Sequence, residues 1–172
     1  MATSTASKPS IKVADEVWIV IAMLHQRQPD RPDFSIEEIM EFARTSKELR
    51  LLGPLRPGFY VHVVQHCVAN RPANPGRYRM LMETAPGRRR LFRPGDSYNS
   101  QREGGKTSPK PAELPEDSFR GLLSWYHDRW CAEASKRAAE EDPLLALYGS
   151  GKKLWADEHG DEYVKRLREG WE

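Results

Sequence analysis

Apolar residues recur at helical spacing in successive segments of the first half of the chain. The first segment runs from Val13 to Leu24 with its apolar residues on one helix face, and it ends before Pro29. The second starts at Ser35, which forms a capping-box pattern with Glu38. Its apolar stripe consists of Ile36, Ile39, Met40 and Ala43. Both segments are therefore predicted to be helices that bury one face.

A third helix is expected to open at Pro57, because proline at the first helical position loses no needed hydrogen bond, and to end near Asn70. Two strands are predicted over residues 77–83 and 88–93, joined by a tight turn at residues 84–87. This order of three helices and a hairpin resembles the winged helix-turn-helix family of DNA-binding domains over residues 11–95. The resemblance implies a mainly α, α+β fold in which the hairpin is a two-stranded wing.

The remaining segments are expected to differ in character. Residues 1–10 are small and polar and are predicted to be disordered, and residues 96–115 are predicted to be an extended, partly mobile linker. Residues 116–172 are predicted to be a helical C-terminal extension. The longest apolar run, Trp18–Leu24, is far shorter than the ~20 residues of a membrane span, and no signal peptide is evident. We therefore expect a cytoplasmic protein that does not cross a membrane.

Charge is distributed unevenly along the chain. Residues 44–93 carry eleven Lys/Arg against two Asp/Glu, a net charge of +9, whereas residues 1–43 and 94–172 carry −3 and −4. Ten of those eleven cations are arginines. Such a block indicates either a surface that faces phosphate or an acidic protein partner.

The arginines of this block are candidate DNA contacts, because planar guanidinium groups match phosphate oxygens. The two strands carry six of them: Arg77, Arg79, Arg88, Arg89, Arg90 and Arg93. The third helix is expected to contribute base contacts. Together with the arginines that flank the helix, these candidates are Arg56, His62, Gln65, His66 and Arg71. The interior of that helix has no Lys or Arg, so a helix that contacts only the DNA backbone, or a protein, stays open. The arginine-rich strand could also pair with the acidic C-terminal part.

Other patterns do not predict an enzyme. His62 and His66 have the spacing of a zinc-protease helix, but Val63 replaces the required glutamate and no third ligand is evident. The two cysteines, Cys67 and Cys131, are expected to be buried thiols. Residues 149–152 lack the phosphate-loop pattern, and no nucleophile stands in a recognisable context. We therefore expect no catalytic site, no metal and no cofactor.

The C-terminal thirty residues resemble the toxin-neutralising tails of antitoxins that pair with PIN-domain ribonuclease toxins. The resemblance implies a tail whose apolar residues anchor it on the toxin while Arg166 or Arg168 approaches the toxin's acidic site. The anchors would be Leu144, Leu147, Trp155, Tyr163, Val164, Leu167 and Trp171. The same stripe could instead pack on the protein's own body. A homodimer is the other partner expected, formed through Phe119, Leu122, Tyr126 and Trp130.

Together these patterns predict a non-enzymatic, antitoxin-like transcriptional regulator that binds double-stranded DNA through its arginine-rich wing and a protein through its tail. The alternative is an interaction adaptor whose winged helix contacts protein and whose arginines face acidic side chains. An RNA-binding version is a third reading. The salt dependence of binding to duplex DNA distinguishes the first two, because neutralising several phosphates makes affinity fall steeply with salt.

Overall fold

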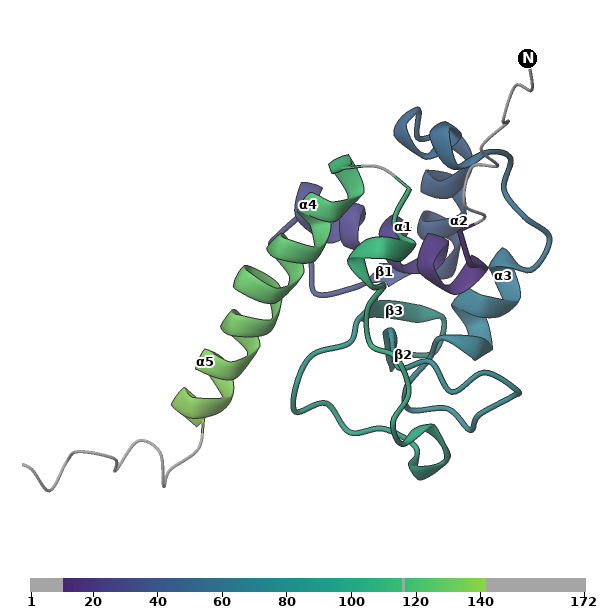
Figure 1. The fold of residues 1–172 in the computed structure, drawn as a ribbon. Coiled ribbons are helices and arrows are strands. Elements are labelled where there is room, and N and C mark those ends of the chain that lie inside the picture. Colours follow the sequence, from purple (N-terminus) through teal and green to yellow (C-terminus); the bar gives the residue numbers. More distant parts are fainter. Residues whose placement is uncertain (1–10, 116, 142–172) are drawn as a thin grey trace, which may run out of the picture. The chain divides into compact units, whose positions relative to one another are not determined.

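The computed structural model describes residues 11–115 and 117–141. Within residues 11–132, helices pack around one small sheet (Figure 1). The chain divides into two compact units, one ending at Ala132 and the other beginning at Glu133. The helices of the first unit, in chain order, are α1 (Val13–Arg27), α2 (Ile36–Thr45), η1 (Glu48–Leu52), α3 (Phe59–Val61), η2 (His62–His66), η3 (Ser100–Arg102), η4 (Pro111–Glu113), α4 (Asp117–Trp125) and η5 (Tyr126–Cys131). One further helix, α5 (Ala132–Glu141), follows.

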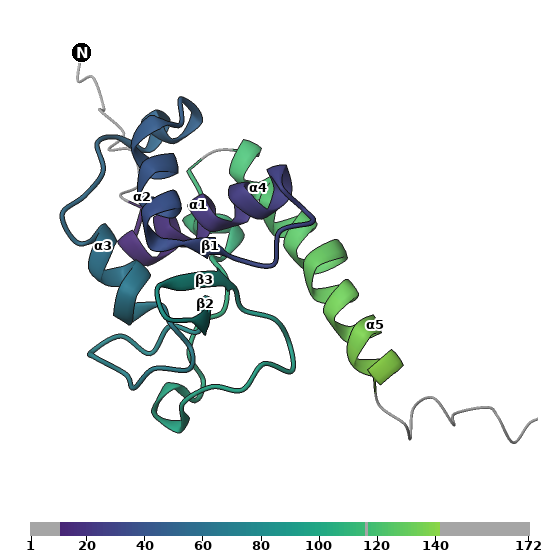
Figure 2. The same cartoon turned by 180° about the vertical axis from the view of Figure 1, so that it is seen from behind.

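The sheet has three antiparallel strands in the order β1-β3-β2 (Figures 1 and 2). These strands are β1 (Phe34–Ser35), β2 (Leu81–Ala85) and β3 (Arg88–Leu91). The hairpin of β2 and β3 confirms the predicted pair of strands, and Gly87 closes it with a φ of 74°, which favours glycine. Strand β1 is not among the predicted strands. It pairs with the start of β3, where Ser35 lies opposite Arg88.

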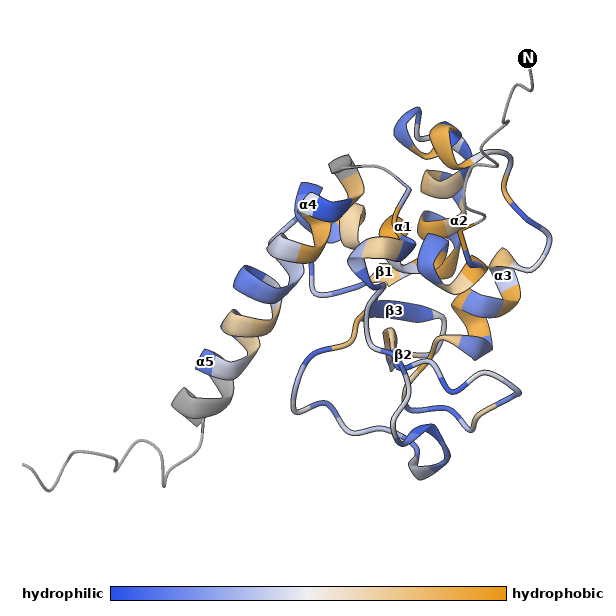
Figure 3. Ribbon diagram, in the orientation of Figure 1, coloured by the Kyte–Doolittle hydropathy of each residue, from blue (hydrophilic) through white to orange (hydrophobic). Residues whose placement is uncertain are grey.

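The core surrounds α1 on nearly all sides. Trp18, Ile19 and Ile21 are completely buried although they lie at different angles around the helix. The sequence predicted one buried face, but residues 14–25 are all buried, because the sheet, α3 and α4 contribute to the same apolar cluster. Figure 3 shows α3 as a largely apolar ribbon, whereas the central strand β3 is strongly hydrophilic.

The start of α2 confirms the predicted capping box. The Ser35 hydroxyl accepts a hydrogen bond from the backbone N–H of Glu38, and the Glu38 carboxylate accepts one from the backbone N–H of Ser35. Both bonds satisfy amide groups that the first turn of a helix leaves unpaired. This cap fixes the point at which β1 turns into α2.

The expected linker over residues 96–115 is instead part of the compact unit. Arg102 and Leu114 are buried, and the Lys106 ammonium contacts the carboxylates of Asp15 and Glu113. Asp15 lies in α1 and is itself completely buried. Residues 96–115 have few apolar residues and pack through charged side chains, so their sequence has no apolar pattern that would indicate packing.

The predicted homodimer surface is also internal. Phe119, Leu122, Tyr126 and Trp130 are each at most 4% exposed and belong to the core of this chain. The Tyr126 ring meets Trp18 of α1 edge-on at 5.4 Å, and its hydroxyl donates to the carbonyl of Phe92 at 2.8 Å. These aromatic residues find their partner within the chain, so the expected boundary between residues 11–95 and a C-terminal extension is wrong.

No helix within residues 11–115 and 117–141 combines the length and apolar character that a bilayer-spanning helix needs.

Candidate functional site

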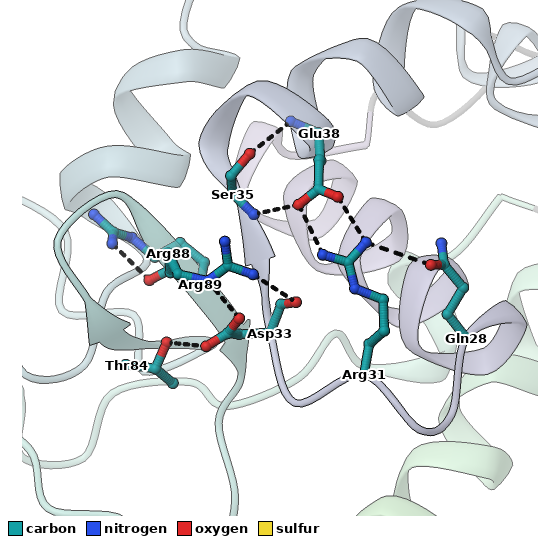
Figure 4. Close-up of polar contacts among 8 residues, drawn as sticks. All are labelled: Gln28, Arg31, Asp33, Ser35, Glu38, Thr84, Arg88 and Arg89. Carbon is teal, nitrogen blue, oxygen red and sulfur yellow. Dashed lines mark hydrogen bonds and ion pairs between the residues drawn. The ribbon is translucent and has the colours of Figure 1, made fainter.

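The arginines of the hairpin contact carboxylates of the same chain. Arg88 Nε donates to Asp33 Oδ1 at 2.6 Å, and the same carboxylate accepts from the Thr84 hydroxyl (Figure 4). Arg90 donates to both oxygens of Asp96 at 2.6 and 2.7 Å. Such two-point pairs are the stronger class of ion pair. Neither guanidinium projects freely from the hairpin.

Arg89 is fully buried although it lies in the middle strand of the sheet. Its guanidinium donates to the carbonyls of Val63 and Val64 at the end of the third helix and to Glu83. Burial lowers the pKa of Arg89, and Glu83 opposes that effect. Glu83 also accepts two hydrogen bonds from Arg71, which hold the pKa of this carboxyl below its usual range. This cluster ties the helix to the hairpin.

The other predicted arginine contacts are mostly engaged as well. Arg56 pairs with Glu16 and donates to the carbonyl of Ile11. The guanidinium groups of two others lie over aromatic rings, Arg79 at 4.2 Å from the centre of Tyr98 and Arg93 at 4.0 Å from that of Trp130. Arg77 alone of the predicted set is exposed without an ion pair in the described part of the chain. The structure does not form these arginines into a continuous row of free cations.

The third helix is shorter than predicted and changes geometry along its length. It begins at Phe59 and ends at His66, and its second half is a π-helical turn. Phe59, Val63 and Cys67 are completely buried at a spacing of four residues, so they form the face of this segment that packs into the core. Tyr60 and Val61 are 52% and 45% exposed. The most exposed side chains of this helix are therefore not those of the predicted base contacts His62, Gln65 and His66.

The candidate base-reading residues His62, Gln65 and His66 are partly buried and partly engaged. His62 Nδ1 lies 2.8 Å from the carbonyl oxygen of Gly58, and burial lowers the pKa of His62. Gln65 Nε2 donates to the carbonyl of Pro72 at 3.0 Å. The two imidazole rings lie 4.8 Å apart in an edge-to-face arrangement. No group of three potential metal ligands is present among the described residues.

Arg102 is a central residue that the sequence analysis missed. It is completely buried, and its guanidinium donates to six backbone carbonyls, two at the end of the third helix and four in the irregular segment that connects this helix to β2. These carbonyls belong to Gln65, His66, Arg71, Pro72, Gly76 and Tyr78. The chain passes so close to this segment that a Cβ at Gly105 would lie 1.7 Å from the Arg77 carbonyl oxygen. No short motif predicts such a contact, because its acceptors are backbone atoms.

Exposed cations also lie around the end of α2 and the η1 turn. Arg44, Lys47 and Arg50 are exposed, and their side chains form no ion pair within the described part of the chain. The carboxylate between them, Glu48, pairs with Arg27. A net positive patch therefore remains here, on residues that were not among the predicted contacts.

The predicted tail contacts, from Leu144 to Trp171, lie outside the described residues. Comparison with known proteins finds no match to the chain, whether with protein-family models, curated proteins or solved structures. Functional inference therefore depends on the residues and their geometry.

Proposed function

We propose that the compact unit is a protein-interaction module with a winged-helix arrangement of its first three helices and its sheet. The order helix, short strand, two helices and two strands, with β3 between β1 and β2, supports the winged-helix part. The single observation that carries the interaction part is the engagement of the hairpin arginines by Asp33, Glu83 and Asp96.

The energetics of these ion pairs support the proposal. Removing one partner from a buried pair destabilises a protein by about 3–5 kcal/mol, so Arg89 cannot exchange Glu83 for phosphate without disrupting its own site. The third helix adds a consistent observation, because Tyr60 and Val61 are its two most exposed residues. Exposed tyrosine is common in protein interfaces, whereas phosphate contacts require cations or hydrogen-bond donors.

Fluorescence anisotropy with a labelled random-sequence duplex tests this proposal on the full chain. From about 50 to about 200 mM salt, a protein that makes 6–10 phosphate contacts loses affinity ~10³–10⁵-fold. We expect little or no duplex binding at low salt and no comparable salt dependence. Tight, salt-sensitive duplex binding that is weakened by Arg88→Ala and Arg90→Ala would refute the interaction module.

The second candidate is the antitoxin-like transcriptional regulator of double-stranded DNA. The exposed cations Arg44, Lys47, Arg50 and Arg77 favour it, because they are available for phosphate without breaking an ion pair. In this case the same titration gives binding that falls steeply with salt, and substituting these four residues removes it while Arg88→Ala does not. A PIN-type toxin as the partner of the tail stays a prediction from sequence resemblance.

A further inference from the structure

A hollow of about 200 Å³ opens beside the free cations of the η1 turn. Its apolar lining comes from three elements: Val20 of α1, Ala43 of α2, and Leu49 and Leu55 in and after η1. Arg44 and Arg50 also line it and are exposed. The hollow is therefore lined by both apolar and charged side chains, with two exposed arginines among them.

The size of the hollow limits what can bind there. Sites for small molecules usually enclose about 300–1,000 Å³, so this one is too small for a typical organic ligand. It is large enough for one apolar side chain, which is how an anchor residue of a protein partner binds. Leu51 lies in the same turn and is 50% exposed, so apolar surface continues outside the hollow.

The charges around the hollow favour one kind of partner. Arg44, Lys47 and Arg50 carry three positive charges within seven residues. The carboxylate in the lining, Glu16, is 8% exposed and paired with Arg56, so its charge is compensated. An approaching segment would meet a net positive edge and gain from carboxylates of its own.

We propose that this hollow binds an acidic segment of a partner protein, with one apolar side chain inserted between Val20, Leu49 and Leu55 and carboxylates facing Arg44 and Arg50. The inference rests on the proposed interaction function and specifies the chemistry of the partner. Residues of α1, α2 and η1 meet at this point, so the site is held by the core rather than by a loose loop.

The test uses the full chain and a short fluorescein-labelled peptide in which one leucine is flanked by glutamates. Two control peptides replace the leucine by serine or the glutamates by lysines. We expect the acidic leucine peptide to bind, both controls to bind more weakly, and the backbone amide signals of residues 49–53 and of Leu55 to shift in NMR spectra. Failure of the acidic peptide to bind, or equal binding of the serine control, would overturn the inference.

Variants locate the binding surface. Arg44→Glu with Arg50→Glu should weaken peptide binding about tenfold or more, because two attractions become repulsions, while Arg129→Glu, an exposed arginine of η5, should leave binding unchanged. Ala43→Met should weaken it by filling the hollow without changing charge. If the double variant binds the peptide as well as the unaltered chain does, the proposed site is wrong.

Binding to duplex DNA distinguishes a failure of the proposed interaction function from a failure of the proposed acidic partner. If the chain binds duplex DNA tightly and Arg44→Glu with Arg50→Glu abolishes that binding, both the interaction module and its acidic partner are refuted. If neither duplex DNA nor the acidic peptide binds, only the assignment of the partner is refuted.

Discussion

Replacing Arg102 by methionine removes the donors of six backbone carbonyls while keeping a long apolar side chain. Four of these bonds, to the carbonyls of Gln65, His66, Arg71 and Tyr78, are 2.6–2.8 Å long. Hydrogen bonds to a charged group contribute about 1.5–3 kcal/mol each, so the four represent ~6–12 kcal/mol. The variant also avoids burying a cation, which costs several kcal/mol. We expect a net loss of about 3–5 kcal/mol in the free energy of unfolding.

Urea unfolding followed by tryptophan fluorescence measures this loss. With a slope of about 2 kcal/mol per molar urea, Arg102→Met should lower the midpoint by roughly 2 M. Arg102→Lys should give a smaller loss, because an ammonium offers three donors rather than five. Arg129→Met changes the same residue type at an exposed position and should have an effect within about 0.5 kcal/mol. Equal midpoints for the Arg102→Met and Arg129→Met variants would show that the carbonyl contacts do not stabilise the fold.

Three further predictions follow from other sites. Hydrogen bonds from Arg31 lower the pKa of Glu38 to about 2 from an ordinary value of 4.5, so the stability that the Glu38 carboxylate adds is complete above about pH 4.5 and is lost as the pH falls toward 2. In unfolding titrations, Glu38→Gln should therefore lose less stability on acidification than the unaltered chain. An unchanged pH dependence would contradict this. Burial raises the pKa of the Cys67 thiol. A thiol reagent should therefore modify the partly exposed Cys131 in the native chain, and Cys67 only after denaturation. Equal rates of modification at the two cysteines in the native chain would exclude the buried position of Cys67. A chain ending at residue 141 should fail to co-purify with a co-expressed PIN-type toxin that the full chain retains, and retention by both would exclude the tail.

Features encoded by neighbouring residues could be predicted from the sequence. The capping box of Ser35 and Glu38 involves residues three positions apart, and the hairpin turn at Gly87 is equally local. Strand β1 could not be predicted, because two residues have no detectable period and become a strand only by pairing with β3. The π turn after Val61 could not be predicted either, because the prediction assumed the regular spacing of an α-helix.

The candidate site shows a limit of counting charges along a sequence. The block of residues 44–93 was correctly seen to be rich in arginine, but the carboxylate that binds Arg88 is Asp33, 55 positions away. Only the pairing of β1 with β3 brings these two side chains together. The exposed cations Arg44 and Arg50 had no feature in the sequence that separated them from engaged arginines. Long-range pairing, rather than composition, decides which charges face solvent.

The packing of Tyr126 and Trp130 against α1 has a consequence for how this unit can be passed between proteins. Its first 95 residues leave Trp18 without the ring of Tyr126 and the carbonyl of Phe92 without its hydrogen-bond donor, and they also lack Arg102. Gene fusion or domain shuffling that cuts after the hairpin would therefore transfer an incomplete core. The smallest block that evolution could move intact ends near Ala132.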